Sequence, residues 1–181
     1  MGVMGVVGLV VTGLVLTFVI SAWLGRPVVF GYNEGPTQPI AFPHQVHVQD
    51  LQLDCVFCHR MVEEERVASI PSVGLCMTCH SVVGDNRTEV TQKLRPLFES
   101  GKPIDWVRVH RVPDFVKFAH DAHVQFFSKR DGVPASQTCA VCHGDVGSMI
   151  KVQQVRSLKM GDCVDCHRQL NAPTDCVVCH Y

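Results

Sequence analysis

The sequence predicts a mostly irregular and α-helical protein with little or no β-sheet and one hydrophobic helix at its N-terminal end. Two observations support this fold class. Residues 1–25 contain no charged side chain, and the pattern Cys-x-x-Cys-His occurs five times in the remaining chain. All ten cysteines of the 181-residue chain belong to these motifs. The formal net charge of −1 gives no basic surface of the kind that binds nucleic acid.

The five motifs are typical of covalent attachment of c-type haem. Two thiols form thioethers to the porphyrin edge, and the adjoining histidine is held beneath the iron as its proximal ligand. A zinc site would pair its cysteine knuckles, which an odd number of motifs cannot do evenly. A thioredoxin-like site needs a βαβ pattern, and a disulfide scaffold does not require histidine after every second cysteine. We therefore predict five haem c groups on Cys55 and Cys58, Cys76 and Cys79, Cys139 and Cys142, Cys163 and Cys166, and Cys176 and Cys179, with proximal ligands His59, His80, His143, His167 and His180.

Five further histidines match the five irons one to one, and they are the predicted distal ligands: His44, His47, His110, His120 and His123. Four of them lie in two copies of the pattern Phe-x-His-x-x-His, at 42–47 and 118–123. On a helical turn, residues three apart lie on the same side, so two imidazoles can reach two neighbouring haems. His110 has no such context, and Met160 is its rival, because methionine is a known sixth ligand in c-type cytochromes.

A haem with two protein ligands has no open position for substrate. We therefore expect electron transfer without a catalytic site in this chain. Five haems in about 140 residues leave little polypeptide to cover each of them, so the haems must supply most of the core. The expected secondary structure is short helices at the motifs, joined by long loops.

Residues 1–25 are expected to form a transmembrane helix, since 24 helical residues span roughly 36 Å and a bilayer core is about 30 Å thick. A cleaved signal peptide is the alternative, but the apolar stretch is long and lacks a basic start. Because haem c is attached outside the cytoplasmic membrane, the haem domain is expected on the periplasmic side of a bacterial cytoplasmic membrane.

The expected organisation is an anchor at 1–25, a Pro- and Gly-containing linker at 26–41, and a pentahaem domain at 42–181. The domain divides into a two-haem half at 42–85, a connector at 86–117 and a three-haem half at 118–181. Apolar spacing predicts a helix over 88–100 in the connector.

Phe-x-His-x-x-His ahead of Cys-x-x-Cys-His resembles the cytochrome c7 and c3 type of multihaem cytochrome. The runs LDCVFCHRMVEEERVASIPSVGLCMTCH and PIDWVRVHRVPDFVKFAHDAHV are similar to the pentahaem, membrane-anchored subunit of bacterial alternative complex III. That resemblance implies a conducting subunit of a menaquinol-oxidising complex in a respiratory or photosynthetic chain. Its implied partners are an iron–sulfur subunit, a monohaem cytochrome, polytopic quinol-binding subunits and a soluble electron acceptor.

Two other functions compete with this one. A stand-alone membrane-anchored quinol dehydrogenase that feeds a periplasmic reductase would also carry one N-terminal helix, but its first haem usually follows that helix closely. Here 30 residues separate Leu24 from Cys55. A multihaem reductase would need a haem with an open side, and the histidine count leaves none.

Overall fold

The computed structural model describes residues 2–24, 35–84 and 88–181. The described residues form helices and irregular loops, and their β-structure is limited to an isolated antiparallel bridge between Val116 and His180. The prediction of a mostly helical and irregular chain without sheet is therefore confirmed. The helices are α1 (Val3–Leu24), η2 (Val46–Asp50), α2 (Cys55–Cys58), α3 (Val73–His80), α4 (Glu89–Glu99), α5 (His120–Asp131), α6 (Ala135–Thr138), α7 (Ala140–His143), η3 (Val146–Ser148), α8 (Met160–Gln169) and α9 (Cys176–Cys179).

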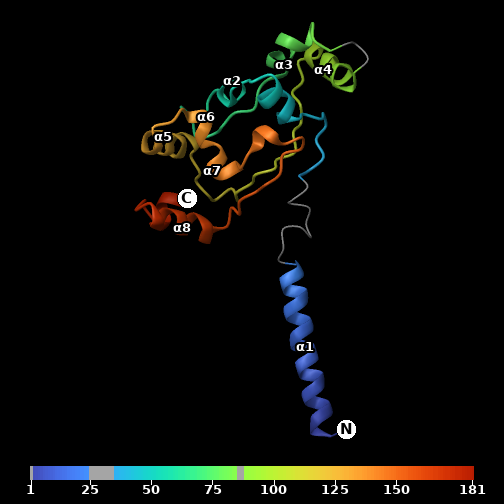
Figure 1. Cartoon of the computed structure of the whole chain (residues 1–181), viewed down its shortest axis with the longest axis vertical. Coiled ribbons are helices and arrows are strands. Elements are labelled where there is room, and N and C mark those ends of the chain that lie inside the picture. Colours follow the sequence, from blue (N-terminus) through green and yellow to red (C-terminus); the bar gives the residue numbers. More distant parts are fainter. Residues whose placement is uncertain (1, 25–34, 85–87) are drawn as a thin grey trace.

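Helix α1 stands apart from the other elements, and its residues 5–20 are exposed (Figure 1). Its two threonines satisfy their hydroxyls within the helix: Thr12 Oγ1 donates to Gly8 O and Thr17 Oγ1 to Gly13 O, at 2.9 and 2.8 Å. The predicted helix is therefore confirmed, but the predicted membrane span is not supported. In the part of the chain that the structure describes, no helix combines the length and the apolar character needed to cross a membrane.

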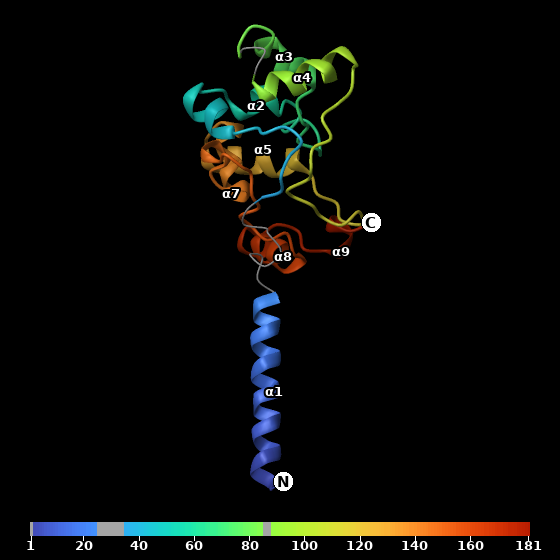
Figure 2. The ribbon, with the colours of Figure 1, turned by 90° about the vertical axis from the view of Figure 1, so that its right-hand side faces the viewer.

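Most of the predicted linker, residues 26–34, lies outside the described residues, as does residue 85 at the expected end of the first half. The remaining described chain places its elements in a consistent order along the longest axis of the molecule. Helices α3 and α4 lie at one end, α2, α5 and α7 follow, and α8 and α9 lie at the other end (Figures 1 and 2).

Every Cys-x-x-Cys-His motif folds as one helical turn. The histidine N–H donates to the carbonyl of the first cysteine in the first, third and fifth motifs, at 2.9 Å for each of His59, His143 and His180. The second and fourth motifs lie within α3 and α8. This turn places the two sulfurs on one side, with the imidazole one residue further on. The predicted short helices at the attachment motifs are confirmed.

The N-terminal capping of these turns follows from the sequence. Asp54 accepts the N–H of Val56 ahead of α2, and Ser72 accepts the N–H of Leu75 ahead of α3. Thr88 caps α4 in the same way, so the helix predicted over 88–100 is observed as Glu89–Glu99. Such caps satisfy N–H groups that have no partner inside the helix.

Two small apolar clusters hold the domain together. The first joins α3 to α4 through Ile40, Val73, Met77 and Leu94, with Trp106 packed against it. The second joins the two halves, since Val62 packs with Val124 and Ala135. Clusters of this size bury little apolar surface for a domain of this length, as expected where cofactors supply the core.

Leu94 is 3% exposed at the centre of the first cluster, so Leu94→Ala is expected to lower the free energy of unfolding of the haem-loaded protein by about 2–5 kcal/mol. Denaturant unfolding followed by circular dichroism measures this change. Leu51, which is 60% exposed, is the matched control, and Leu51→Ala should change stability by no more than about 0.5 kcal/mol. Equal effects of the two substitutions would contradict the assignment of this cluster to the core.

Candidate haem-binding site

The structure fixes the tautomer of five of the ten site histidines through backbone carbonyls. Nδ1 of His59 lies 2.7 Å from Ser69 O, and Nδ1 of His167 lies 2.6 Å from Pro173 O. Nδ1 of His120 lies 3.0 Å from Arg66 O. A carbonyl oxygen can only accept, so each Nδ1 carries the proton and each Nε2 keeps a free lone pair for a metal. This is the usual second-sphere arrangement of a metal-binding histidine.

Ser69 adopts a left-handed conformation with φ 54° in order to present its carbonyl to His59. That conformation is unfavourable for a residue with a Cβ atom, and such residues concentrate at functional sites. Sequence reasoning did not find Ser69 or Pro173, because a backbone acceptor leaves no trace in the side-chain pattern.

The two Phe-x-His-x-x-His segments have the same geometry. Phe42 stacks on His47 with ring centroids 4.3 Å apart and meets His44 edge-on at 4.9 Å. The matching distances for Phe118 with His123 and His120 are 4.6 and 4.9 Å. In both copies the second histidine donates Nδ1–H to the carbonyl of the residue after the phenylalanine, Pro43 at 3.1 Å and Ala119 at 2.7 Å.

We call each of these three-ring units a clamp: Phe42 with His44 and His47, and Phe118 with His120 and His123. The second histidine of the first clamp lies in the π-helical turn η2. Both histidines of the second clamp lie in the first turn of the regular helix α5. Both clamps therefore place their two imidazoles on a helical turn, and in both the phenylalanine packs against the histidine rings.

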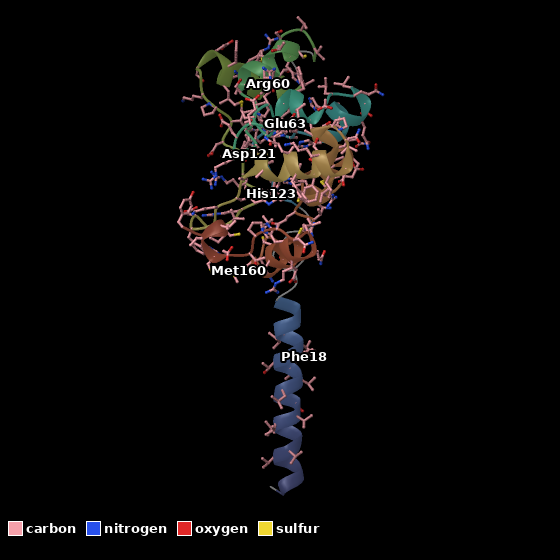
Figure 3. The ribbon with its side chains drawn as sticks, turned by 90° about the vertical axis from the view of Figure 1, so that its left-hand side faces the viewer. Phe18, Arg60, Glu63, Asp121, His123 and Met160 are labelled. Atoms are coloured by element: carbon pink, nitrogen blue, oxygen red, sulfur yellow. The ribbon has the colours of Figure 1, made fainter. Side chains whose placement is uncertain are left out.

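In each clamp the second histidine faces the histidine of an attachment motif. The ring centroids of His47 and His80 are 6.3 Å apart, and those of His123 and His167 are 6.0 Å apart. A metal–imidazole bond is about 2.0 Å long and the ring centre lies about 1 Å beyond the nitrogen, so two imidazoles on opposite faces of one metal have centres about 6 Å apart. His123 lies on the side of α5 that faces α8 (Figure 3).

The third motif gathers three histidines. The ring of His143 lies 6.5 Å from that of His120 with the planes 7° apart. His110 also reaches this place, with its Nε2 3.3 Å from His143 Nδ1. Burial, followed by the charges of His110, His120 and His59, lowers the pKa of His143 to about 4, and burial and His120 lower the pKa of His110. Both imidazoles are neutral near pH 7, which is the form that binds a metal.

The first motif shows the same electrostatics. Burial and then the charges of His59 and His47 lower the pKa of His44 to about 4. His44 Nδ1 and His80 Nδ1 are buried and have no hydrogen-bond partner among the described residues.

The fifth motif is tied to the connector. Val116 bridges His180, and the N–H of Lys117 donates to Cys179 O at 2.7 Å. The ring of Phe115 stacks against His180 at 5.8 Å. Met160 opens α8 with its side chain 68% exposed. The structure thus brings His110 to the third motif.

All ten cysteines are free thiols, which stand for the thioether sulfurs of the haem-loaded protein. Cys55 and Cys139 hydrogen-bond to one another; this contact lowers the pKa of Cys55 to about 7 and raises that of Cys139. Within the described residues, no three or more His, Cys, Asp or Glu side chains are gathered to hold a bare metal ion. Paired sulfurs beside a histidine, facing a second histidine across about 6 Å, fit a porphyrin iron.

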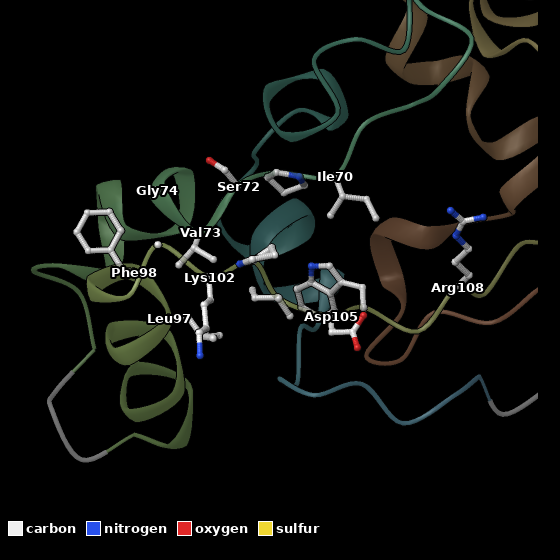
Figure 4. Close-up of a pocket in the computed structure, with 14 residues that line it drawn as sticks. Ile70, Ser72, Val73, Gly74, Leu97, Phe98, Lys102, Asp105 and Arg108 are labelled. Carbon is white, nitrogen blue, oxygen red and sulfur yellow. The ribbon is translucent and has the colours of Figure 1, made fainter.

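A cavity of about 650 Å³ lies beside the second motif, between the start of α3, the end of α4 and residues 101–108 (Figure 4). Its walls are mainly apolar, including Ile70, Leu97 and Trp106. Lys102 and Arg108 also line it, and their cationic groups suit the carboxylates that a porphyrin carries. Lys117 lies elsewhere, where its Nζ donates to Val177 O at 3.1 Å.

No protein-family model matches this chain. The chain is 30% identical, over 191 residues, to the menaquinone reductase, multiheme cytochrome c subunit, of Nitratidesulfovibrio vulgaris, and the alignment covers 93% of this chain and 87% of that protein. This chain belongs to the family of multihaem cytochrome c subunits. The covalent attachment of haem c that the motifs predicted is a property of that family, and the paired sulfurs and imidazoles of this multihaem cytochrome fit it.

Phe118 orients both histidines of the second clamp, so Phe118→Leu in the haem-loaded cytochrome is expected to change the low-spin EPR signals of the haems bound by His120 and His123. Leucine keeps most of the apolar volume, so the stability should fall by only about 1 kcal/mol. Phe126→Leu, on the same helix, is the control and should leave the spectrum unchanged. An unaltered spectrum in Phe118→Leu would show that the stacked ring does not set the ligand orientation.

Proposed function

We propose that this multihaem cytochrome carries five covalently bound haem c groups and relays electrons between a membrane quinone-converting complex and a periplasmic acceptor. The observation that supports this proposal most directly is the pairing of imidazoles at 6.3 Å (His47 and His80) and 6.0 Å (His123 and His167). Two imidazoles at this separation would hold one iron between them. An iron closed on both faces exchanges electrons but does not bind substrate.

The proposed ligand pairs follow the repeat of the clamps. In each clamp the first histidine serves the next motif along the chain and the second histidine serves the motif after that. The pairs are therefore His44 with His59, His47 with His80, His120 with His143, and His123 with His167. The distances given above for three of these pairs, and the electrostatic interaction of His44 with His59, support the scheme. His110 or Met160 completes the fifth site with His180.

The bound haems supply reversible one-electron chemistry. The polypeptide would attach them through its thiols, and the carbonyls that accept from Nδ1 of five histidines leave Nε2 of those rings available to the irons. The direction of electron flow depends on the potentials of the two ends, so the same chain can serve quinol oxidation or quinone reduction. The relative is named as a subunit of a menaquinone reductase, which supports a link between this chain and a quinone-converting complex.

The proposed location is the cytoplasmic membrane of a bacterium, with the haem domain on the periplasmic side. The proposed companions are an iron–sulfur subunit, a monohaem cytochrome and polytopic quinone-binding subunits, as in alternative complex III. A stand-alone quinol dehydrogenase is the second candidate, and the relative's name as one subunit of a larger reductase favours the first.

Closed iron centres predict a spectrum that is fully low-spin, with no binding of carbon monoxide at neutral pH. His110→Ala and Met160→Ala test the fifth site. Replacing the true ligand should convert one haem of five to a high-spin form that binds carbon monoxide, whereas replacing the other residue should not. Optical and EPR spectra of both variants, with haem counts by mass spectrometry, measure the outcome. A high-spin fraction in the unsubstituted protein would contradict the relay proposal.

Purification from membranes in a mild detergent tests the assignment to a complex. We expect co-purifying chains that include an iron–sulfur subunit and polytopic subunits, identified by peptide mass spectrometry. Recovery of this cytochrome alone, with quinol oxidation in the purified fraction, would favour the stand-alone dehydrogenase. Fewer than five thioether-linked haems on the intact chain would refute the proposed cofactor set.

A further inference from the structure

The attachment motifs do not follow one another in space as they do along the chain. The second motif, on α3, lies at one end of the domain, and the first, on α2, lies between it and the third motif at α6 and α7 (Figures 1 and 2). The fourth and fifth motifs, on α8 and α9, lie at the opposite end. The first half of the chain therefore runs from the middle of the domain outward, so that its first motif faces the second half.

The contact between the halves is made by the first and third motifs. Cys55 opens α2 and Cys139 directly follows α6, so the packing of these two helices brings the two attachment points together. Helix α2 packs against α6 at this junction, and Val56 packs on the cluster of Val62, Val124 and Ala135.

The backbone reinforces this junction. The first turn of α5 is capped by the segment that follows the first motif, since the N–H groups of His120 and Asp121 donate to Arg66 O and Glu65 O at 3.1 and 3.3 Å. Gln125 Nε2 adds a bond of 2.9 Å to Glu63 O. Helix α5, which carries His120 and His123, is thus attached to the first half by these hydrogen bonds.

The remaining neighbours follow from the placement of the helices and from the histidines. Helices α8 and α9, which carry the fourth and fifth motifs, lie together at one end of the domain (Figure 2). The clamps agree, because the neighbouring histidines His44 and His47 serve the first and second sites, and His120 and His123 serve the third and fourth.

We propose that the five attachment sites form a single file in the order second, first, third, fourth, fifth, with Cys55 and Cys139 at the junction of the halves. The two ends of the file are then the second site, beside the cavity of Figure 4, and the fifth site, beside the connector at 115–117. Redox partners make contact at these ends, and the first and third sites are interior. This inference rests on the proposed function, because it requires all five haems.

A cryo-EM map of the purified, haem-loaded protein with its companion subunits tests the order directly. We expect the haems on Cys55 and Cys139 to be nearest neighbours and the haem on Cys76 to have one neighbour only. A map in which the second haem lies between two others, or in which the first and third are not adjacent, would overturn the inference. Fewer than five haems in the map would instead refute the proposed function.

Potentiometric titration of haem-deletion variants provides an independent test. An oxidised haem carries one more positive charge than a reduced haem, and this charge acts most strongly on its nearest neighbours. Removing the second haem with Cys76→Ala and Cys79→Ala should shift the midpoint of one remaining haem, whereas Cys55→Ala with Cys58→Ala should shift two. Cys176→Ala with Cys179→Ala removes the haem at the other end of the file. This control should shift the midpoint of one remaining haem. Two shifted midpoints after loss of the second haem would refute the order.

Discussion

The structure depends on one constraint: a single helical turn must present two sulfurs to a porphyrin edge and an imidazole to its iron. The hydrogen bond from the histidine N–H to the first cysteine carbonyl closes that turn at His59, His143 and His180. A turn of four or five residues has little stability alone, because the conformational entropy lost in forming the first helical hydrogen bond outweighs the free energy gained from that bond. The motifs are therefore held by their surroundings: side-chain caps at Asp54 and Ser72, carbonyls at Ser69 and Pro173, and the bound cofactor itself.

The proposed relay also needs every iron to be closed from its other face. The two clamps proposed for this role share the same ring geometry, although one lies at a π-helical turn and the other on a regular α-helix. The common features are the phenylalanine stacked on the second histidine and the bond from Nδ1 to the carbonyl that follows the phenylalanine. Local hydrogen bonding and ring packing therefore specify the clamp more strictly than the helix type does.

Sequence patterns predicted the elements of this protein better than their arrangement. Motif spacing was sufficient for the helical turns, and apolar spacing for α4, because both depend on residues that are close in the chain. Two long-range contacts were not predicted: that of Cys55 with Cys139, and the hydrogen bonds of α5 to residues 63–66. Packing between distant parts of the chain leaves no local periodicity in the sequence. Ser69 O and Pro173 O were missed because backbone acceptors are present at every residue. The approach of His110 to His143 was likewise not predicted, because the two residues are 33 positions apart in the chain. For residues 1–25 the composition predicted the helix correctly, but the inferred membrane span was not supported.

The contact between Cys55 and Cys139 also bears on how the protein matures. Before haem is attached, both residues are thiols, and the lowered pKa of Cys55, about 7, leaves part of it as thiolate at neutral pH near Cys139. Thiolates are the reactive form, so in the oxidising compartment proposed above a folded chain without haem would be exposed to disulfide formation at this position. Such a bond would consume one sulfur from each of two attachment sites. Attachment of haem before the two halves pack together would avoid this loss.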